Sequence, residues 1–144
     1  MIEVDNRTNY NIDLSKLNLV TKELDITQDI ELLLVDNNEI KELNLTHRGV
    51  DKATDVLSFP ISKAKHLPLG SIVISVDYAK DVSIKLSHSL EDEVALLFIH
   101  GLLHIMGYDH ETDNGEMRKK EKELINALSL PKSLIIRTEG EKVC

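Results

Sequence analysis

The segment 90–106 constrains the fold most, because it predicts a helix that is apolar nearly all round. Its middle, 94–99, reads Val-Ala-Leu-Leu-Phe-Ile. Ser89 and Asp92 form the pattern of a capping box at its start, and Gly107 is placed to end it in a left-handed conformation. A helix with apolar residues on most sides is usually buried. We therefore expect the rest of the chain to pack around this segment.

Strand and helix patterns alternate along the rest of the chain. Alternating or β-branched apolar residues predict strands, and helical spacing predicts helices. The expected strands are 2–4, 30–35, 54–59 and 71–76; the expected helices are about 14–24, 37–47, a segment after Asp77, and 113–128, followed by a short tail over 134–136. A chain of 144 residues suits one domain, spanning 1–144. We expect an α/β (α+β) fold with a mixed, roughly four-stranded sheet packed by helices.

Two histidines on the central helix, and a third just beyond it, have the spacing of a metal site. Residues four apart on a helix differ by about 40°, so His100 and His104 point the same way. Gly107 lets the chain turn back, so that His110 can supply a third nitrogen. Three protein ligands leave a fourth position for water, which is typical of catalytic zinc. We predict one Zn²⁺ ion at the C-terminal end of this helix, held by three histidines and a water molecule. His47, His66 and His88 lack this spacing and are predicted to lie on the surface.

The spacing H-x-x-x-H-x-x-G-x-x-H is that of the metzincin zinc proteases. Gly101 stands where those enzymes carry the glutamate that acts as general base. The metal scaffold is thus the same, but peptide hydrolysis by that mechanism is disfavoured.

The net charge and the cysteine content limit the kinds of partner and the cellular compartment to be expected. The formal net charge is −8, which argues against a general nucleic-acid binder with a broad basic face. The single cysteine, Cys144, allows no internal disulfide, as expected in a reducing cytosol. The chain shows no signal-peptide pattern and no apolar stretch of about 18 residues that could span a bilayer. We expect a cytoplasmic protein without a membrane partner.

Three blocks of residues together point to a known family. The first is His100–His110, with glycine at the second position. The second is Leu43-Asn44 followed by Arg48 and then Thr54–Pro60, and a third, weaker block is Leu69-Gly70 leading into 72–75. These blocks resemble the YbeY family of bacterial rRNA maturation factors. Ser71 and Ala53 depart from the family pattern, which commonly has Asp and Pro at those positions.

The resemblance implies a zincin-like α/β domain and a metal-dependent, single-strand-specific endoribonuclease. It implies a role in rRNA processing, including maturation of the small-subunit rRNA 3′ end, and in ribosome quality control. The implied partners are single-stranded regions of rRNA and a ribosomal subunit or its associated proteins, and DNA is not expected. The implied catalytic residues are Arg48, His100, His104 and His110, with zinc on the three histidines.

Several roles follow as hypotheses. The planar fork of Arg48 suits a phosphate, and Lys52, Lys63 and Lys65 could extend a basic path toward the metal. Asp109 either orients a ligand histidine or faces water. The nucleophile is either a water whose pKa zinc lowers toward about 7 or the RNA 2′-hydroxyl.

Two other functions use the same metal site. One is a zinc peptidase of metzincin-like spacing, which Gly101 disfavours. The other is a non-catalytic ribosome-assembly factor in which zinc only holds the fold, and the acidic balance mildly favours it. An open water position on the metal would speak against this second function.

Overall fold

The computed structural model describes residues 1–140, so Cys144 lies outside the described residues. Four strands and six helices occur in that part of the chain. In order they are β1 (Ile2–Asn6), α1 (Ser15–Glu23), β2 (Ile30–Val35), α2 (Asn37–Arg48), β3 (Val56–Pro60), β4 (Gly70–Ser75), α3 (Val76–Leu86), α4 (Leu90–Ile105), α5 (Glu116–Ala127) and α6 (Ser133–Gly140). No helix within residues 1–140 is both long and apolar enough to cross a membrane.

The four strands form one mixed sheet in the order β1-β2-β4-β3. β1 pairs with β2, and β2 with β4, in parallel, while β3 pairs with β4 antiparallel. The predicted mixed four-stranded sheet is therefore confirmed. Pro60 does not follow β3 but closes it opposite Gly70, which is allowed because β3 is an edge strand and proline is tolerated at edges.

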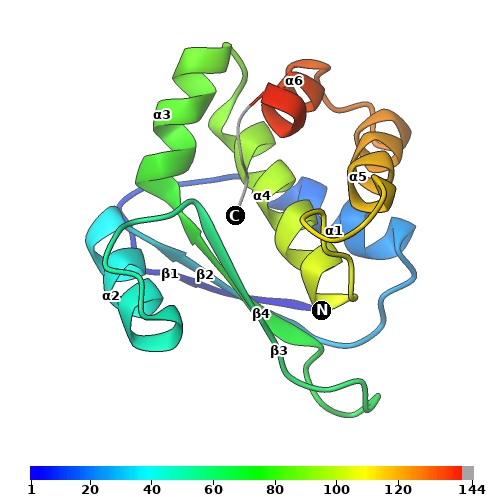
Figure 1. Cartoon of the computed structure of the whole chain (residues 1–144), viewed down its shortest axis with the longest axis horizontal. Coiled ribbons are helices and arrows are strands. Elements are labelled where there is room, and N and C mark those ends of the chain that lie inside the picture. The colour runs from blue at the N-terminus through cyan, green and yellow to red at the C-terminus, as the bar shows by residue number, and fades with distance from the viewer. Residues whose placement is uncertain (141–144) are drawn as a thin grey trace.

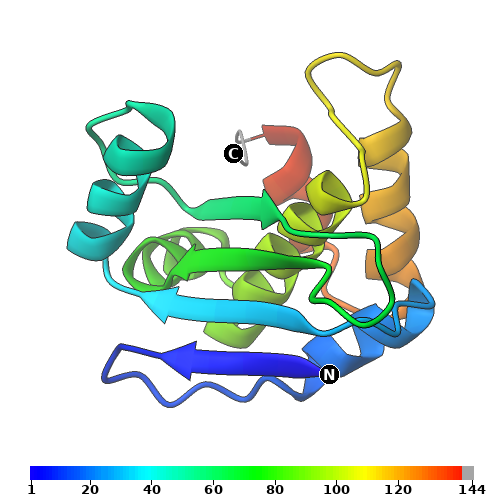
Figure 2. The ribbon, with the colours of Figure 1, turned by 90° about the horizontal axis from the view of Figure 1, so that it is seen from below.

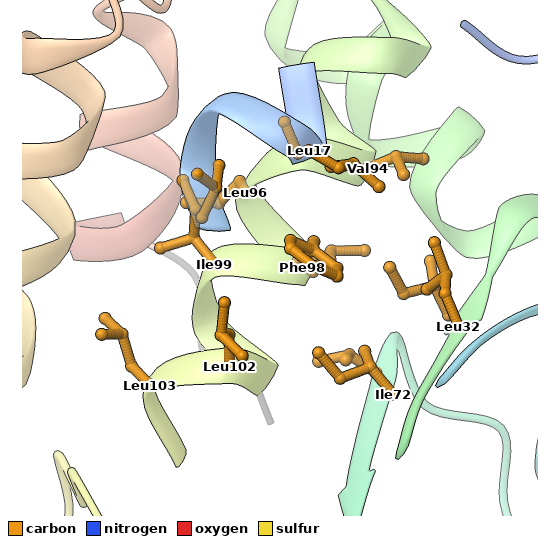
Figure 3. Packing of buried hydrophobic residues seen from close by; sticks show 14 of the residues in the cluster. Leu17, Leu32, Ile72, Val94, Leu96, Phe98, Ile99, Leu102 and Leu103 are labelled. Atoms are coloured by element: carbon orange, nitrogen blue, oxygen red, sulfur yellow. The ribbon is translucent and has the colours of Figure 1, made fainter. Parts of the chain in front are cut away.

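Helix α4 is the centre of the molecule, as its apolar sequence predicts. It runs behind the sheet with α3 beside it, and α1, α5 and α6 surround its other sides (Figures 1 and 2). Figure 3 shows Phe98 on the side of α4 that faces Leu32 and Ile72 of the sheet, whereas Leu103 points the other way. All four side chains are fully buried. Burial on both sides explains why this helix carries so few polar residues.

The other face of the sheet is covered only in part, by α2. A smaller buried cluster forms there from Val35, Ile40, Leu57 and Val73. Phe59 packs against this cluster from the edge strand. The last turn of α2 and strand β3 are thereby held next to each other.

The C-terminal segment is not the predicted short tail but helix α6, whose Arg137 is fully buried. Arg137 Nε donates a hydrogen bond of 2.9 Å to Glu93 Oε2 of α4. Its Nη2 donates another, also of 2.9 Å, to Asp55 Oδ2, just before β3. Burial works against the charge, but the two carboxylates raise the pKa of Arg137 above its ordinary value. These ion pairs fasten α6 to the central helix and to the start of the edge strand.

The prediction of a surface position is wrong for His88. Its side chain is 1% exposed, because its ring lies between Glu93 Oε1 at 2.9 Å and Ser133 Oγ at 3.0 Å. His66, on the loop between β3 and β4, is exposed as predicted. His47 is also exposed, at the end of α2.

Candidate metal centre and its cleft

His100 and His104 point toward each other from the C-terminal half of α4. Their Nε2 atoms are 3.0 Å apart. Each Nδ1 already has an acceptor at 3.0 Å, Glu121 Oε1 for His100 and the Tyr108 carbonyl oxygen for His104. When both rings are neutral, their Nδ1 atoms carry the hydrogens and both Nε2 atoms present lone pairs. Two lone pairs at this distance repel each other, and a shared cation removes the repulsion.

His110 completes the group from the turn after α4. Gly107, with a φ of 104°, begins this turn, so the predicted left-handed glycine is confirmed. One ligand atom from each of the three histidines lies within 4.8 Å of the others. Nδ1 of His110 is buried without a hydrogen-bond partner among the described residues. A converging set of nitrogens that includes an orphaned one fits a metal ion, and nitrogen donors suit zinc.

The protonation of the histidines favours metal binding. Burial lowers the pKa of His104, and the neighbouring His100 lowers it further. The pKa of His110 is lowered by burial first, and then by His100 and Arg118. Both rings are therefore held in the neutral form, which is the form that binds metals.

Glu121 of α5 is a site residue that the sequence reasoning missed. Its side chain and that of His100 are both completely buried, so their hydrogen bond forms away from water. Arg118 Nη1 lies 3.5 Å from the other carboxylate oxygen. A sequence signal existed: Glu121 shares the buried face of α5 with Met117, Leu124 and Ile125, and an acidic residue among apolar ones needs a partner.

Within residues 1–140, Asp109 makes no hydrogen bond to a ligand histidine, which was one of its two predicted roles. It is exposed, and its Oδ1 accepts the backbone N–H of Glu111 over 3.0 Å. The Asp109 carboxylate therefore accepts a backbone hydrogen bond in the turn near His110. The carboxylate that contacts a ligand histidine is that of Glu121.

Gly101 faces the sheet rather than open space. A Cβ at this position would lie 3.1 Å from Ile72 Cγ2 and 3.4 Å from Val56 Cγ2. The contact with Ile72 is tighter than ordinary van der Waals contact and that with Val56 is at the lower edge of the ordinary range, so α4 lies close to β3 and β4 here. A glutamate at position 101 would have to displace this packing before its carboxylate could reach the histidines.

His104 and His110 line a cleft of about 620 Å³, which we call the histidine cleft, while His100 is fully buried behind them. Its walls are the end of α2, strand β3 and the turn after α4, contributed by His47, Arg48, Val56, Leu57, Ser58, Phe59, Pro60, His104, Gly107, Tyr108, Asp109, His110 and Glu111. Arg48 is thus brought to the same cleft as His104 and His110, although 56 residues separate it from His104 in the numbering (104 − 48). The predicted basic path is absent from this lining, since Lys52, Lys63 and Lys65 are exposed outside it.

Comparison with known proteins agrees with this architecture. A solved structure, the solution structure of TM1509 from Thermotoga maritima, matches with a TM-score of 0.60 and 29% identity over 89% of both chains. The fold and the site together define a mixed α/β domain with a three-histidine group at the end of its central helix.

Sequence comparison identifies the family. The family described as Endoribonuclease YbeY matches residues 3–129. Endoribonuclease YbeY of Nautilia profundicola is 59% identical over 139 residues, covering 96% of this chain and 99% of that protein. The protein of the same name from Helicobacter pylori strain P12 is 54% identical with the same coverage, and that from Sulfurimonas denitrificans is 49% identical, covering 97% of this chain and 100% of the relative. The chain belongs to the YbeY family of endoribonucleases.

Proposed function

We propose that this chain is a zinc-dependent, single-strand-specific endoribonuclease that acts in rRNA processing, including maturation of the small-subunit rRNA 3′ end, and in ribosome quality control. One observation carries the proposal: two members of the three-histidine group, His104 and His110, line the same cleft as Arg48. Family membership supplies the endoribonuclease activity, and the site supplies groups suited to a phosphodiester. The proposal treats 1–144 as a single catalytic domain.

The three histidines would hold the metal. His100 and His104 offer Nε2, each oriented through its Nδ1 by Glu121 or by the Tyr108 carbonyl, and His110 offers its own ring nitrogen. A zinc ion held there supplies a Lewis acid for a phosphoryl oxygen and lowers the pKa of a coordinated water. The side chains around it keep the ligands in one orientation, which limits the reorganisation needed during the reaction.

Arg48 would bind the phosphate of the scissile strand. Its guanidinium is exposed at the end of α2 and lines the histidine cleft. A planar fork of donors can bind two oxygens of one phosphate, which positions it better than a point charge does. Arg48 would thus orient the phosphate relative to the three histidines.

The first experiment joins metal analysis to cleavage of a precursor rRNA. Wild-type protein should contain one equivalent of zinc and cut single-stranded precursor regions, whereas His104→Ala should lose most of both. His66→Ala, which removes an exposed histidine outside the cleft, is the matched control and should behave as wild type. Full zinc content and activity in His104→Ala would refute the metal assignment.

A second experiment tests Arg48 and the alternatives. Arg48→Glu should keep zinc but lose cleavage, and unchanged RNA binding and cleavage would refute the phosphate role. A casein digestion run beside the RNA assay separates a peptidase from a nuclease. Zinc-loaded protein that cuts neither substrate would favour the assembly-factor function, in which zinc only holds the fold.

The cellular setting completes the proposal. We expect the protein to work in the cytoplasm on rRNA, in contact with a ribosomal subunit or its associated proteins. With a formal net charge of −8, the free protein has little general attraction for RNA. Contact with a ribosomal protein would supply affinity that the charge does not.

A further inference from the structure

The rings of His47 and Phe59 form an aromatic pair inside the histidine cleft. Their centroids are 5.1 Å apart with an interplanar angle of 57°. His47 comes from the last turn of α2 and Phe59 from β3, and both line the same cleft as His104 and His110. His47 is exposed and Phe59 is half-buried. One ring of the pair is therefore available to a molecule that enters the cleft.

The pair is held in place before any ligand arrives. Phe59 packs against the buried cluster beneath α2, formed by Val35, Ile40, Leu57 and Val73. His47 leans on Phe59, and its backbone belongs to a helix closed by Gly49 in the left-handed region. Binding to such a surface loses little conformational freedom.

The charges around the cleft make this pair important for RNA. Arg48 is the lone cation among its lining residues, against the carboxylates of Asp109 and Glu111. Apart from the charge of a bound metal ion, the lining side chains have a formal charge of 1 − 2 = −1. Arg48 alone can neutralise few phosphates of a longer strand, and electrostatic affinity rises with the number of phosphates neutralised. Affinity for a single strand then needs a contribution from the bases.

We propose that His47 and Phe59 form a nucleobase-stacking subsite, with His47 as the exposed platform. The inference rests on the proposed endoribonuclease function and explains how the histidine cleft would select its substrate. Arg48 directly follows His47 in the chain, and both line the cleft. The base of one nucleotide can therefore stack on the His47 ring while the phosphate of the same nucleotide binds the Arg48 guanidinium. Unstacked bases bind to aromatic rings, including histidine, whereas paired bases are stacked in their duplex. The subsite therefore favours single strands over duplexes.

The test measures binding separately from cleavage. The probe is a fluorescein-labelled 2′-O-methyl oligonucleotide of mixed sequence, compared with versions that carry an abasic residue at one position at a time. Zinc-loaded full-length protein is titrated by fluorescence anisotropy, and a denaturing gel verifies that the probe stays intact. His47→Ala should bind the full probe about tenfold more weakly. One of the abasic probes should lack the base that stacks on His47, and wild type should bind that probe most weakly. His47→Ala and wild type should bind that probe equally well, because the base that would stack is absent.

Two variants serve as controls. His47→Tyr keeps a ring and should restore binding, whereas His66→Ala should match wild type. Wild-type binding should also weaken only slightly with salt, with a slope of log K against log[salt] near about −0.7 for one phosphate contact. Equal losses on full and abasic probes, unchanged binding in His47→Ala, or no rescue by His47→Tyr would overturn the inference. If those results occur while His104→Ala still abolishes cleavage, the stacking subsite fails and the proposed function stands.

Discussion

The hydrogen bond from His100 to Glu121 yields a quantitative prediction about metal affinity. Glu121→Gln keeps the size of the side chain and an acceptor oxygen but removes the charge. A carboxylate behind a ligand histidine makes the ligating nitrogen more basic, and losing it typically costs 10–100-fold in metal affinity, or about 1.4–2.7 kcal/mol. The pair is completely buried, so water cannot replace the lost charge. Arg118, 3.5 Å from the carboxylate, would also lose its counter-charge. We therefore expect a loss near the upper end of this range.

The assay is competition for zinc against a chromophoric chelator at fixed pH. Glu123→Gln is the matched control: it lies on the same helix, is 54% exposed and pairs with Lys120 at 3.7 Å. That variant should bind zinc as wild type does, and far-ultraviolet circular dichroism verifies that both variants are folded. A zinc affinity for Glu121→Gln within twofold of wild type would show that the carboxylate does not support the ligand, and would refute the reasoning.

Three further predictions concern stability, measured on the metal-free protein. Arg137→Met removes one partner of two buried carboxylates and should lower the free energy of unfolding in urea by about 3–5 kcal/mol; a loss below about 1 kcal/mol would contradict the ion-pair assignment. Gly101→Ala gains about 1 kcal/mol of helix propensity, but the contact at 3.1 Å with Ile72 costs about 1–3 kcal/mol; we expect a small net destabilisation, and a higher Tm than wild type would show that Ile72 can yield. The pKa values of His104 and His110 lie below 6.5 in the fold, so the unfolded chain binds more protons just below that pH. Stability should be fully present above pH 6.5 and should fall as pH drops through the lowered pKa values; a flat Tm between pH 7.5 and 5 would contradict these shifts.

The parts of the fold that the sequence predicts well are those with a strong local signal. Helix α4 and strand β4 have apolar or β-branched residues in unbroken runs, and both lie where they were expected. Local spacing also brings His100, His104 and His110 together, because four residues on a helix and one glycine turn decide their geometry.

The parts that were missed depend on contacts between distant segments. Arg137 would read as a solvated cation in a tail, yet it is buried against carboxylates 44 and 82 residues away. Likewise, Glu121 is 21 residues from His100; its place on the apolar face of α5 indicates a buried partner but does not say which residue that partner is. His88 is buried for the same reason, since Ser133 lies 45 residues further along the chain. Local periodicity carries no information about which distant side chains meet.

The close approach of α4 to the sheet at Gly101 also limits how such a domain can evolve. A glutamate there would place its Cβ 3.1 Å from Ile72 Cγ2 and 3.4 Å from Val56 Cγ2, against two buried strand side chains. A single mutation would thus damage the fold before it could provide a general base. A smaller residue at position 72 would relieve the tighter of the two contacts. The spacing between this helix and the sheet thereby disfavours a glutamate at the position where metzincins carry their general base.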